Sequence, residues 1–331
     1  MKKRPPWLGP LVALLLVYAL FAALTPDTFL RSQNLLTMAR QTVVVGICAL
    51  GMTLVIATGG IDLSTGSLVA FTTVVLATLL RAGVPALPAA LAATAAAGLA
   101  GVVAGTLVGR ARMMPFVVTL GTMSALRGAA KGLASEQKVD ADPRGLDALL
   151  SADLAAPGLW MTAALALLVF AVLTFTRFGR HVFAVGSNEA AARLCGIDTG
   201  RVKIAVYTLS SLLAGVAGVM EFSTLTVGDP TDSVGLELEV IAAVVIGGAP
   251  LSGGEGSVAG SVIGALLITV IRTGGVHLGL PSWVQEIATG AIIVAAVAVD
   301  RVRRARGARA AAGRQPAPRD PPARPSSAQS P

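Results

Sequence analysis

Long apolar runs, separated by short polar segments, make up most of this chain. Most runs come close to the roughly 20 apolar residues that an α-helix needs to cross a bilayer. The runs are continuous and do not alternate with polar residues, which excludes the strands of a membrane β-barrel. The pattern therefore predicts an all-α, polytopic membrane helix bundle. Its ten expected spans are residues 7–24, 41–58, 63–80, 86–109, 115–133, 158–176, 204–222, 237–250, 256–272 and 283–299.

The composition agrees with this class and divides the chain into two parts. The residues are 54% hydrophobic and 13% charged, whereas soluble domains are about 25% charged. Residues 1–300 hold all the apolar runs and form one predicted membrane domain. Residues 301–331 carry eight Arg and one Asp, are rich in Pro and Ala, and contain no aromatic residue. Such a segment cannot bury a core, so we expect a disordered basic tail that is attracted to anionic membrane lipid and not to nucleic acid.

The distribution of Lys and Arg predicts the orientation. If the N-terminus is cytoplasmic, the cytoplasmic segments hold 18 of the 26 Lys and Arg residues, in line with the tendency of basic loops to stay inside. Both termini are then cytoplasmic, and residues 127–157 become the largest outer loop. A second outer stretch, residues 221–239, holds five acidic residues and no Lys or Arg. It either faces a partner, lines the mouth of a transport path or is a solvated acidic loop.

Signatures of catalysis and of cofactor binding are scarce. The two His residues lie far apart in the sequence, so no metal site is expected. The segment "GEGSVA" (254–259) matches a loose dinucleotide-binding pattern, but it leads into an apolar run and not into a βαβ unit. The sequence contains no G-x-x-x-x-G-K-[ST] motif, so the chain is not expected to hydrolyse ATP by itself. We therefore expect neither an enzyme nor a bound cofactor.

The polar loop over residues 177–203 encodes a short helix. Asn188 or Ser187 can accept a backbone hydrogen bond as its N-cap. Glu189 lies in the first turn, and Arg193 follows four residues later, which is the favoured order for an acid–base pair. A smooth alanine face and a terminal glycine complete the pattern, which suits either an interfacial helix or an element that fits a cleft on a cytoplasmic partner. The residues of this candidate docking helix are Asn188, Glu189, Ala190, Ala191, Arg193 and Gly196.

Four long segments occur in the order typical of one transporter family. They are "GMTLVIATGGIDLSTGSLVA" (51–70), "MPFVVTLGTMSALRG" (114–128), "GRHVFAVGSNEAAARLCGID" (179–198) and "ELEVIAAVVIGGAPLSGGEGSVAGSVIGAL" (237–266). On these segments the chain resembles the membrane permease subunits of ATP-binding-cassette importers for monosaccharides of the ribose, xylose, arabinose and galactose type. The resemblance runs from about residue 8 to residue 300.

The resemblance implies a transmembrane permease domain over residues 1–300 that passes a monosaccharide into the cytoplasm. It places the chain in the bacterial cytoplasmic (inner) membrane as one copy of a homodimer. The other implied partners are an ATP-binding-cassette ATPase subunit and an extracytoplasmic sugar-binding protein. In this family the loop around Glu189–Gly196 corresponds to the coupling helix that docks in the ATPase dimer. A separate ATPase subunit also accounts for the missing ATP-binding motif.

Two glycine-rich interruptions of the apolar runs predict broken helices. "GGIDLS" (59–64) and "GGAPLS" (247–252) agree at four of six positions, and paired breaks of this kind are typical of a transport path. The span count puts both breaks on the same side of the membrane, whereas an inverted repeat would put them on opposite sides. We expect the helix breaks near 59–64 and 247–256. The residues assigned to them, and to the translocation path, are Gly59, Gly60, Asp62, Ser64, Gly247, Gly248 and Ser252.

Asp62 is the most unusual of these residues, because ionisable groups at membrane depth are costly and normally face a cavity or a partner. Three roles remain open for it. The carboxylate can cap a helix that starts at Leu63, contact sugar hydroxyls, or form a gating pair with an Arg or Lys.

Other functions were weighed against sugar import. Permeases for autoinducer-type furanosyl compounds are close relatives of the family, and another small polar solute is a further alternative. An ion-coupled secondary transporter needs a relay of acidic residues within the membrane, and Asp62 alone gives little support for such a relay. A membrane-embedded enzyme needs clustered His, Asp or Glu residues, which the sequence lacks.

Overall fold

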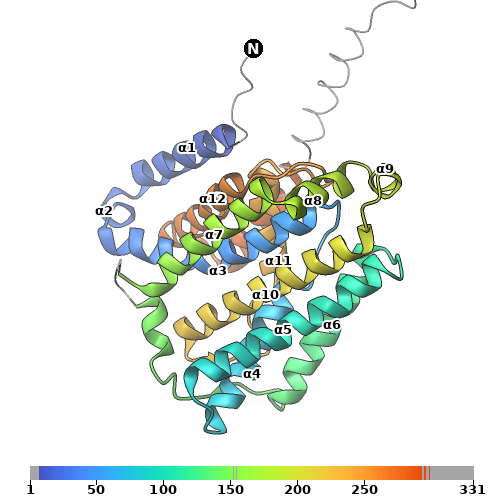
Figure 1. Ribbon diagram of the computed structural model, residues 1–331. Helices are drawn as coiled ribbons and strands as arrows, with labels where there is room; N and C mark the ends of the chain where they lie inside the picture. Colours follow the sequence, from blue (N-terminus) through green and yellow to red (C-terminus); the bar gives the residue numbers. More distant parts are fainter. Residues whose placement is uncertain (1–6, 152, 154, 293, 296–297, 299–331) are drawn as a thin grey trace, which may run out of the picture.

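The computed structural model describes residues 7–151, 153, 155–292, 294–295 and 298, so the predicted tail over residues 301–331 lies outside the described residues. In the described part the chain forms the α-helices labelled α1 to α12, one 3₁₀ helix and two strands of two residues each (Figure 1), and residues 282–292 are also helical. The all-α class is thus confirmed. The elements are α1 (Leu8–Leu24), α2 (Pro26–Phe29), α3 (Ser32–Ala57), α4 (Thr65–Arg81), α5 (Ala86–Gly109), α6 (Pro115–Leu133), β1 (Val139–Asp140), η1 (Leu146–Leu150), α7 (Pro157–Phe175), α8 (Arg177–Ser187), α9 (Glu189–Leu194), α10 (Thr199–Leu225), β2 (Val227–Gly228), α11 (Leu236–Ile246) and α12 (Val258–His277).

The helices support a multi-pass membrane protein without establishing ten spans. Among the described residues, α3, α5, α7, α10 and α12 are long and apolar enough to cross a membrane, and α1 and α4 are shorter apolar helices. The eighth predicted span corresponds to α11, which has only 11 residues and is therefore about 16 Å long, or half of the hydrocarbon core. The tenth, 283–299, lies partly outside the described residues, and its first part, 283–292, is helical.

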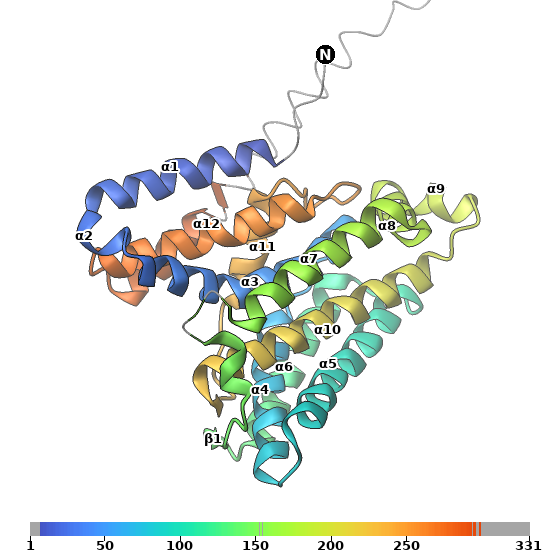
Figure 2. The same cartoon turned by 60° about the vertical axis from the view of Figure 1, so that its left-hand side comes forward.

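Helix α3 forms the centre of the bundle (Figure 2). Every residue from Thr42 to Ala57 is buried, because α7, α10, α11 and α12 pack around it. A helix that is covered on all sides needs no polar face, which explains why this run is apolar all round. Its hydroxyl groups are satisfied within the protein: Thr53 donates a hydrogen bond of 2.7 Å to the hydroxyl oxygen of Ser261 on α12.

Small residues bring α5 and α10 into close antiparallel contact. A Cβ atom at Gly101 would lie 2.6 Å from the Cβ atom of Ser211, and one at Gly109 would lie 2.6 Å from the carbonyl oxygen of Gly200. Neither site has room for a side chain. Helices in lipid associate through packing of this kind, since water expulsion does not drive them together. The glycines of the fourth span that meet α10 therefore serve helix packing.

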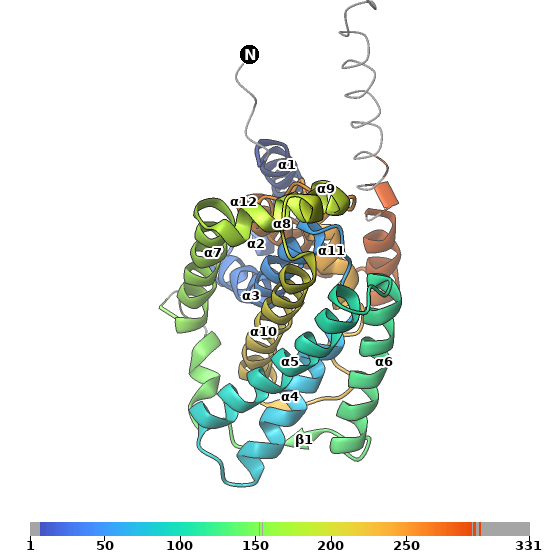
Figure 3. The same cartoon turned by 45° about the vertical axis from the view of Figure 1, so that its right-hand side comes forward.

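The end of the bundle opposite α9 is tied together by β1 and β2, which pair antiparallel (Figure 3). Lys138 forms an ion pair of 3.0 Å with Asp229 next to this ladder. Arg127 on α6 donates hydrogen bonds to the carbonyl oxygens of Pro230 (3.1 Å) and Asp232 (2.6 Å). These contacts hold the segment between α10 and α11 in place, and this segment leads to the polar cavity described below.

Candidate functional site

The first break, residues 58–64, starts with a glycine cap on α3. The backbone N–H of Gly60 donates to the carbonyl of Val55 at 3.1 Å, and that of Gly59 donates to Ile56 at 2.8 Å. Gly59 has a φ of +78°, a conformation that side chains of L-residues rarely adopt. This pair of bonds around a left-handed glycine is the Schellman motif that ends many helices. The expected break of the helix is therefore present.

Asp62 supports the start of α4 without capping it directly. One carboxylate oxygen accepts hydrogen bonds from the backbone N–H (2.9 Å) and the hydroxyl (2.6 Å) of Ser64. Ser64 is itself the N-cap, and α4 begins at Thr65, so the expectation of a helix that starts at Leu63 is wrong by two residues. The bond of Asp62 closes a turn over Ser64 and thereby positions the N-cap.

The surroundings of Asp62 favour this structural interpretation over the two others. The residue is 1% exposed, and none of the ion pairs found among the described residues includes it. It also does not line the polar cavity. The geometry thus offers a hydrogen-bonding role for the carboxylate, and a gating pair finds no cation there.

The second break, residues 247–256, starts with the same cap. The N–H of Ala249 donates to the carbonyl of Val244 at 3.1 Å, and the N–H of Gly248 donates to that of Val245 at 2.9 Å. Gly248 has a φ of +96°. The structural counterpart of Gly59 is therefore Gly248, so the match between "GGIDLS" and "GGAPLS" is displaced by one residue.

Gly247 has a different reason to be glycine. A Cβ atom there would lie 2.5 Å from the carbonyl carbon of Gly260, at the start of α12. The backbones of α11 and α12 touch at this point. Because α11 ends against α12, the two helices form a tight antiparallel pair next to the break.

The two breaks lie against each other in the folded chain. The N–H of Gly254 donates a 3.0 Å hydrogen bond to the carbonyl of Ala57, the last residue of α3. The carbonyl of Ser252 lies beside Gly59, 3.6 Å from the position that a Cβ atom would take.

The last turn of α8 joins the two breaks. A Cβ atom at Gly186 would overlap the carbonyl oxygen of Ala57 and would lie 2.6 Å from the backbone nitrogen of Gly254. A Cβ atom at Gly254 would in turn lie 3.0 Å from the Cα atom of Ser187. We call this meeting point of residues 57–59, 186–187 and 252–254 the break junction. The sequence pattern predicted no helix over α8, and therefore no such contact.

Beyond the junction, α9 has the local structure that its sequence predicts. The side chain of Asn188 accepts a 2.9 Å hydrogen bond from the N–H of Ala191 and is thus the N-cap. Gly196 follows the helix with a φ of +83°. Ala190 and Ala191 are exposed, whereas Ala192 is buried, so the smooth face is narrower than expected. The next apolar side chain, Leu194, is 90% exposed at the end of the helix.

Glu189 is held by two cations. Its carboxylate lies 3.0 Å from Arg193 on the same helix and 2.7 Å from Lys203 on α10. Partial burial acts to raise the pKa of Glu189, but the hydrogen bond and charge of Lys203, together with Thr199 and Arg193, outweigh it, so the pKa lies below its usual value. The pair with Arg193 was predicted. The pair with Lys203 anchors α9 to the start of α10 and was not predicted.

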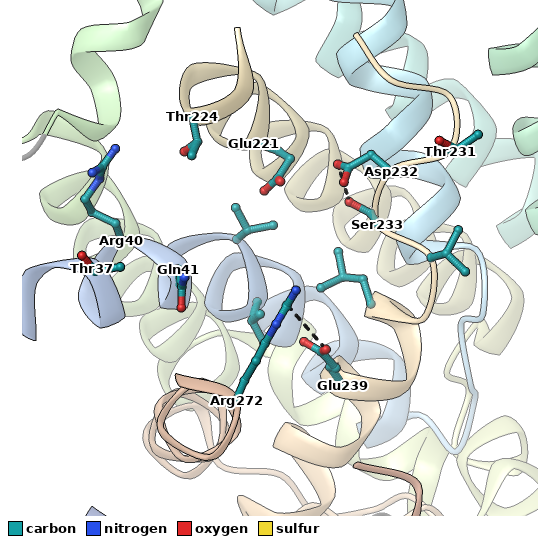
Figure 4. Close-up of a pocket in the computed structure, with 14 residues that line it drawn as sticks. Thr37, Arg40, Gln41, Glu221, Thr224, Thr231, Asp232, Ser233, Glu239 and Arg272 are labelled. Atoms are coloured by element: carbon teal, nitrogen blue, oxygen red, sulfur yellow. Dashed lines mark hydrogen bonds and ion pairs between the residues drawn. The ribbon is translucent and has the colours of Figure 1, made fainter. Parts of the chain in front are cut away.

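A polar cavity of about 520 Å³ lies between α3, α10, α11 and α12, some distance along the bundle from the break junction (Figure 4). The segment between α10 and α11 covers part of it. The volume of the cavity falls in the range of small-molecule sites. The lining residues are Thr37, Arg40, Gln41, Val44, Val45, Glu221, Thr224, Thr231, Asp232, Ser233, Val234, Leu236, Glu239 and Arg272.

The cavity gathers charges of both signs. Arg272 and Glu239 reach toward each other across it, with 3.6 Å between a guanidinium nitrogen and a carboxylate oxygen (Figure 4). Arg40, Glu221 and Asp232 also line it. Two buried atoms, Nε of Arg40 and the second carboxylate oxygen of Glu239, have no hydrogen-bond partner among the described residues. A buried polar atom without a hydrogen-bond partner lowers the stability of the folded protein unless a ligand or a water molecule bonds to it.

The starts of two helices meet at the edge of this cavity. A Cβ atom at Gly66, in the first turn of α4, would overlap the carbonyl oxygen of Ser233 and a carboxylate oxygen of Glu237 and would lie 3.5 Å from Leu236. Ser233 and Leu236 line the cavity. Short helices whose N-termini converge inside a membrane protein are typical of solute sites in transporters. The end of the first break, at Ser64, is therefore followed directly by the turn of α4 that meets the cavity edge.

The predicted path residues and the cavity are distinct sets. None of the seven break residues lines the cavity, and those residues form the caps and the break junction instead. The acidic outer stretch was a better indicator, since Glu221, Asp232 and Glu239 all face the cavity. The sequence interpretation missed Arg40 and Arg272, although single charged residues in or next to apolar runs are a known signal of functional sites. Within the described residues no group of His, Cys, Asp and Glu could hold a metal ion.

Comparison with known protein families identifies the class of the chain. A family model described as "Branched-chain amino acid transport system / permease component" matches residues 34–297. The chain belongs to this permease family. The match covers all the helices from α3 onward that surround the cavity and the break junction.

Individual relatives carry names of ABC transporter permeases, some of them for sugars. The Ribose import permease protein RbsC of Escherichia coli (strain K12) is 40% identical over 301 residues, which cover 89% of this chain and 93% of that protein. The Probable ABC transporter permease protein YphD of the same strain is 43% identical over 295 residues, 88% of each chain. The L-arabinose ABC transporter permease protein AraH of Azospirillum brasilense is 35% identical over 298 residues, 89% of this chain and 88% of that protein. The resemblance to monosaccharide permeases is confirmed. No solved structure matches the chain.

Proposed function

We propose that this permease is the transmembrane subunit of an ATP-driven importer that passes a monosaccharide into the cytoplasm. The observation that carries the proposal is the 40% identity to a ribose import permease over 89% of the chain. The polar, mixed-charge cavity supports it, because such a lining can bond a hydroxylated solute. An autoinducer-type furanosyl compound is the alternative substrate, since it offers similar hydroxyl groups.

The partners follow from the same proposal. A separate ATPase dimer binds α9, whose exposed Ala190, Ala191 and Leu194 offer a small apolar surface next to the charged edge of Glu189 and Arg193. A soluble sugar-binding protein docks at the opposite end, near β1 and β2. Two copies of the chain form the pathway. Both termini lie in the cytoplasm of a bacterium, and the basic tail contacts anionic lipid of the inner membrane.

In this proposal the break junction transmits movement to the path. Closure of the ATPases displaces α9 and the last turn of α8. This turn contains Gly186, which packs directly against the backbone of both breaks. The first break leads to α4, and the start of α4 touches the segment at the cavity edge. Displacement of α4 and α11 then alters access to the cavity. The breaks serve as hinges, since few side chains separate the moving backbones.

Reconstitution tests the proposal. Liposomes that contain this chain with its ATPase should take up labelled sugar only when loaded binding protein is outside and ATP is on the side of the ATPase. The matched control is the same complex with an ATPase variant that binds but does not hydrolyse ATP. Uptake by the permease alone under an ion gradient would favour a secondary transporter instead and would overturn the proposal.

A further inference from the structure

We propose that the polar cavity between α3, α10, α11 and α12 is a low-affinity binding site for a neutral, polyhydroxylated solute of monosaccharide size. Arg40 and Glu239 hold the solute through their unpaired groups. The inference rests on the proposed function and adds to it a defined place on the path, which lies away from the glycine-rich breaks.

The first argument is the pair of unsatisfied buried atoms. Nε of Arg40 is a hydrogen-bond donor and the free carboxylate oxygen of Glu239 is an acceptor, and neither has a partner among the described residues. Both line the same cavity. A hydroxyl group can accept from the first and can donate to the second, so each of these atoms suits a polyhydroxylated solute. The hydroxyls and amide of Thr37, Gln41 and Thr224 add further donors and acceptors around them.

The second argument is the balance of charge. Two guanidinium groups, of Arg40 and Arg272, and three carboxyl groups, of Glu221, Asp232 and Glu239, line the cavity, so the acids outnumber the arginines. This excess of acids disfavours a phosphorylated or carboxylated solute. A neutral solute meets no such repulsion. The cavity therefore selects against anionic relatives of the sugar.

The third argument concerns affinity. Among the described residues, the apolar lining comes from Val44, Val45, Val234 and Leu236, and none of the lining side chains is aromatic. Aromatic rings supply large contact areas in tight sites. In addition, the ion pair between Arg272 and Glu239 already uses part of the hydrogen-bonding capacity of these two side chains. The site is therefore weak, which suits a solute that must leave again.

Thiol protection tests the site in the complete transport complex. Thr224 is exposed to the cavity, so Thr224→Cys in a Cys195→Ser background should react with a small hydrophilic thiol reagent, while Cys48 is buried. A panel of ribose, arabinose and allose at tens of millimolar should slow this reaction at least threefold for one or more sugars. Ribose 5-phosphate at the same concentration should have no effect. The control is Ser32→Cys, also exposed on α3 but outside the cavity, which should react at the same rate throughout.

A second variant assigns the protection to the named residues. Adding Arg40→Met to the Thr224→Cys protein should abolish protection, and adding Arg81→Gln, at the exposed end of α4, should leave it intact. Protection that persists with Arg40→Met, equal slowing by ribose 5-phosphate, or no protection by any sugar would overturn the inference. ATP-driven uptake by the parent complex distinguishes an error in the cavity assignment from an error in the proposed function. If uptake is normal but protection is absent, the cavity assignment alone is wrong, and if uptake is absent the proposed function is wrong too.

Discussion

The backbone N–H of Gly254 donates a hydrogen bond of 3.0 Å to the carbonyl of Ala57. This bond joins the loop before α12 to the end of α3, and Gly186 at the end of α8 packs on both residues without room for a side chain. Three segments far apart in the sequence thus meet backbone against backbone. Because no flexible side chain lies between them, a shift of α8 must displace both breaks.

Gly186→Ala should disable transport. The added methyl group overlaps the carbonyl oxygen of Ala57 and crowds the backbone of Gly254, and overpacking of this kind costs roughly 1–3 kcal/mol. We expect sugar uptake to fall at least tenfold relative to membrane-inserted protein. The matched control is Gly121→Ala on α6, where a Cβ atom meets nothing within 4 Å and uptake should stay normal. Normal uptake by the Gly186 variant would show that the junction tolerates displacement.

Glu189→Lys should uncouple the permease from its ATPase. The substitution replaces two ion pairs, to Arg193 and Lys203, with repulsion, and it reverses the charge that the helix dipole favours. ATP hydrolysis by the assembled complex should lose its stimulation by loaded binding protein, while the amount of inserted permease is unchanged. Arg201→Glu, which alters an exposed charge outside this pair of bridges, is the control. Normal stimulation in the Glu189 variant would remove the coupling role of α9.

The same carboxylate predicts a pH dependence. The pKa of Glu189 lies below its ordinary value in the folded protein, so its contribution to stability is complete above the unfolded pKa of about 4.3 and is lost as the pH falls through the lower folded value. Hydrogen exchange of the α9 amides should therefore show constant protection, corrected for intrinsic rates, between about pH 5 and 8. Glu189→Gln should reduce this protection at pH 7. Loss of protection in the parent protein already near pH 6 would contradict the assignment.

Substitutions of Asp62 distinguish its three roles. If the carboxylate positions the N-cap Ser64, Asp62→Asn should keep most activity, because the amide oxygen still accepts the backbone bond. Asp62→Ala should lose about 1 kcal/mol of stability and more activity. A charged gate predicts that Asn fails as badly as Ala, and a sugar contact predicts a change in apparent affinity or sugar preference. Measurements of uptake against sugar concentration, normalised to the amount of inserted protein, distinguish these patterns. An Asn variant that is fully inserted but inactive would contradict the structural role.

Local patterns were sufficient for many element boundaries. The predicted spans 86–109 and 115–133 have the same bounds as α5 and α6, since polar or helix-starting residues such as Pro115 flank the apolar runs. Asn188 and Gly196 bracket α9 as expected. Caps and hydrophobic periodicity act within one or two turns of a helix, so the sequence close to each boundary contains the necessary information.

The exact start of α4 needed information from elsewhere in the chain. The residues before it form an irregular segment and a turn, and the hydroxyl of Thr119 on α6 donates to the carbonyl of Ile61 at 3.1 Å. The apolar run continues through Leu63 without any local sign of this contact. Hydropathy therefore predicted a helix two residues too early, because a neighbouring helix satisfies the backbone of the break.

The sequence by itself determined the class of the protein, most of its helices, the glycine-rich breaks near 59–64 and 247–256, and the short helix α9. Only the tertiary structure decided that Gly186 contacts both breaks, that Lys203 pairs with Glu189, and that Arg40 and Arg272 line one cavity together with three acids. The physical reason is the distance along the chain over which each effect acts. Propensities, caps and periodicity depend on neighbours along the chain, whereas a cavity and its balance of charge arise only when helices that are distant in sequence pack side by side.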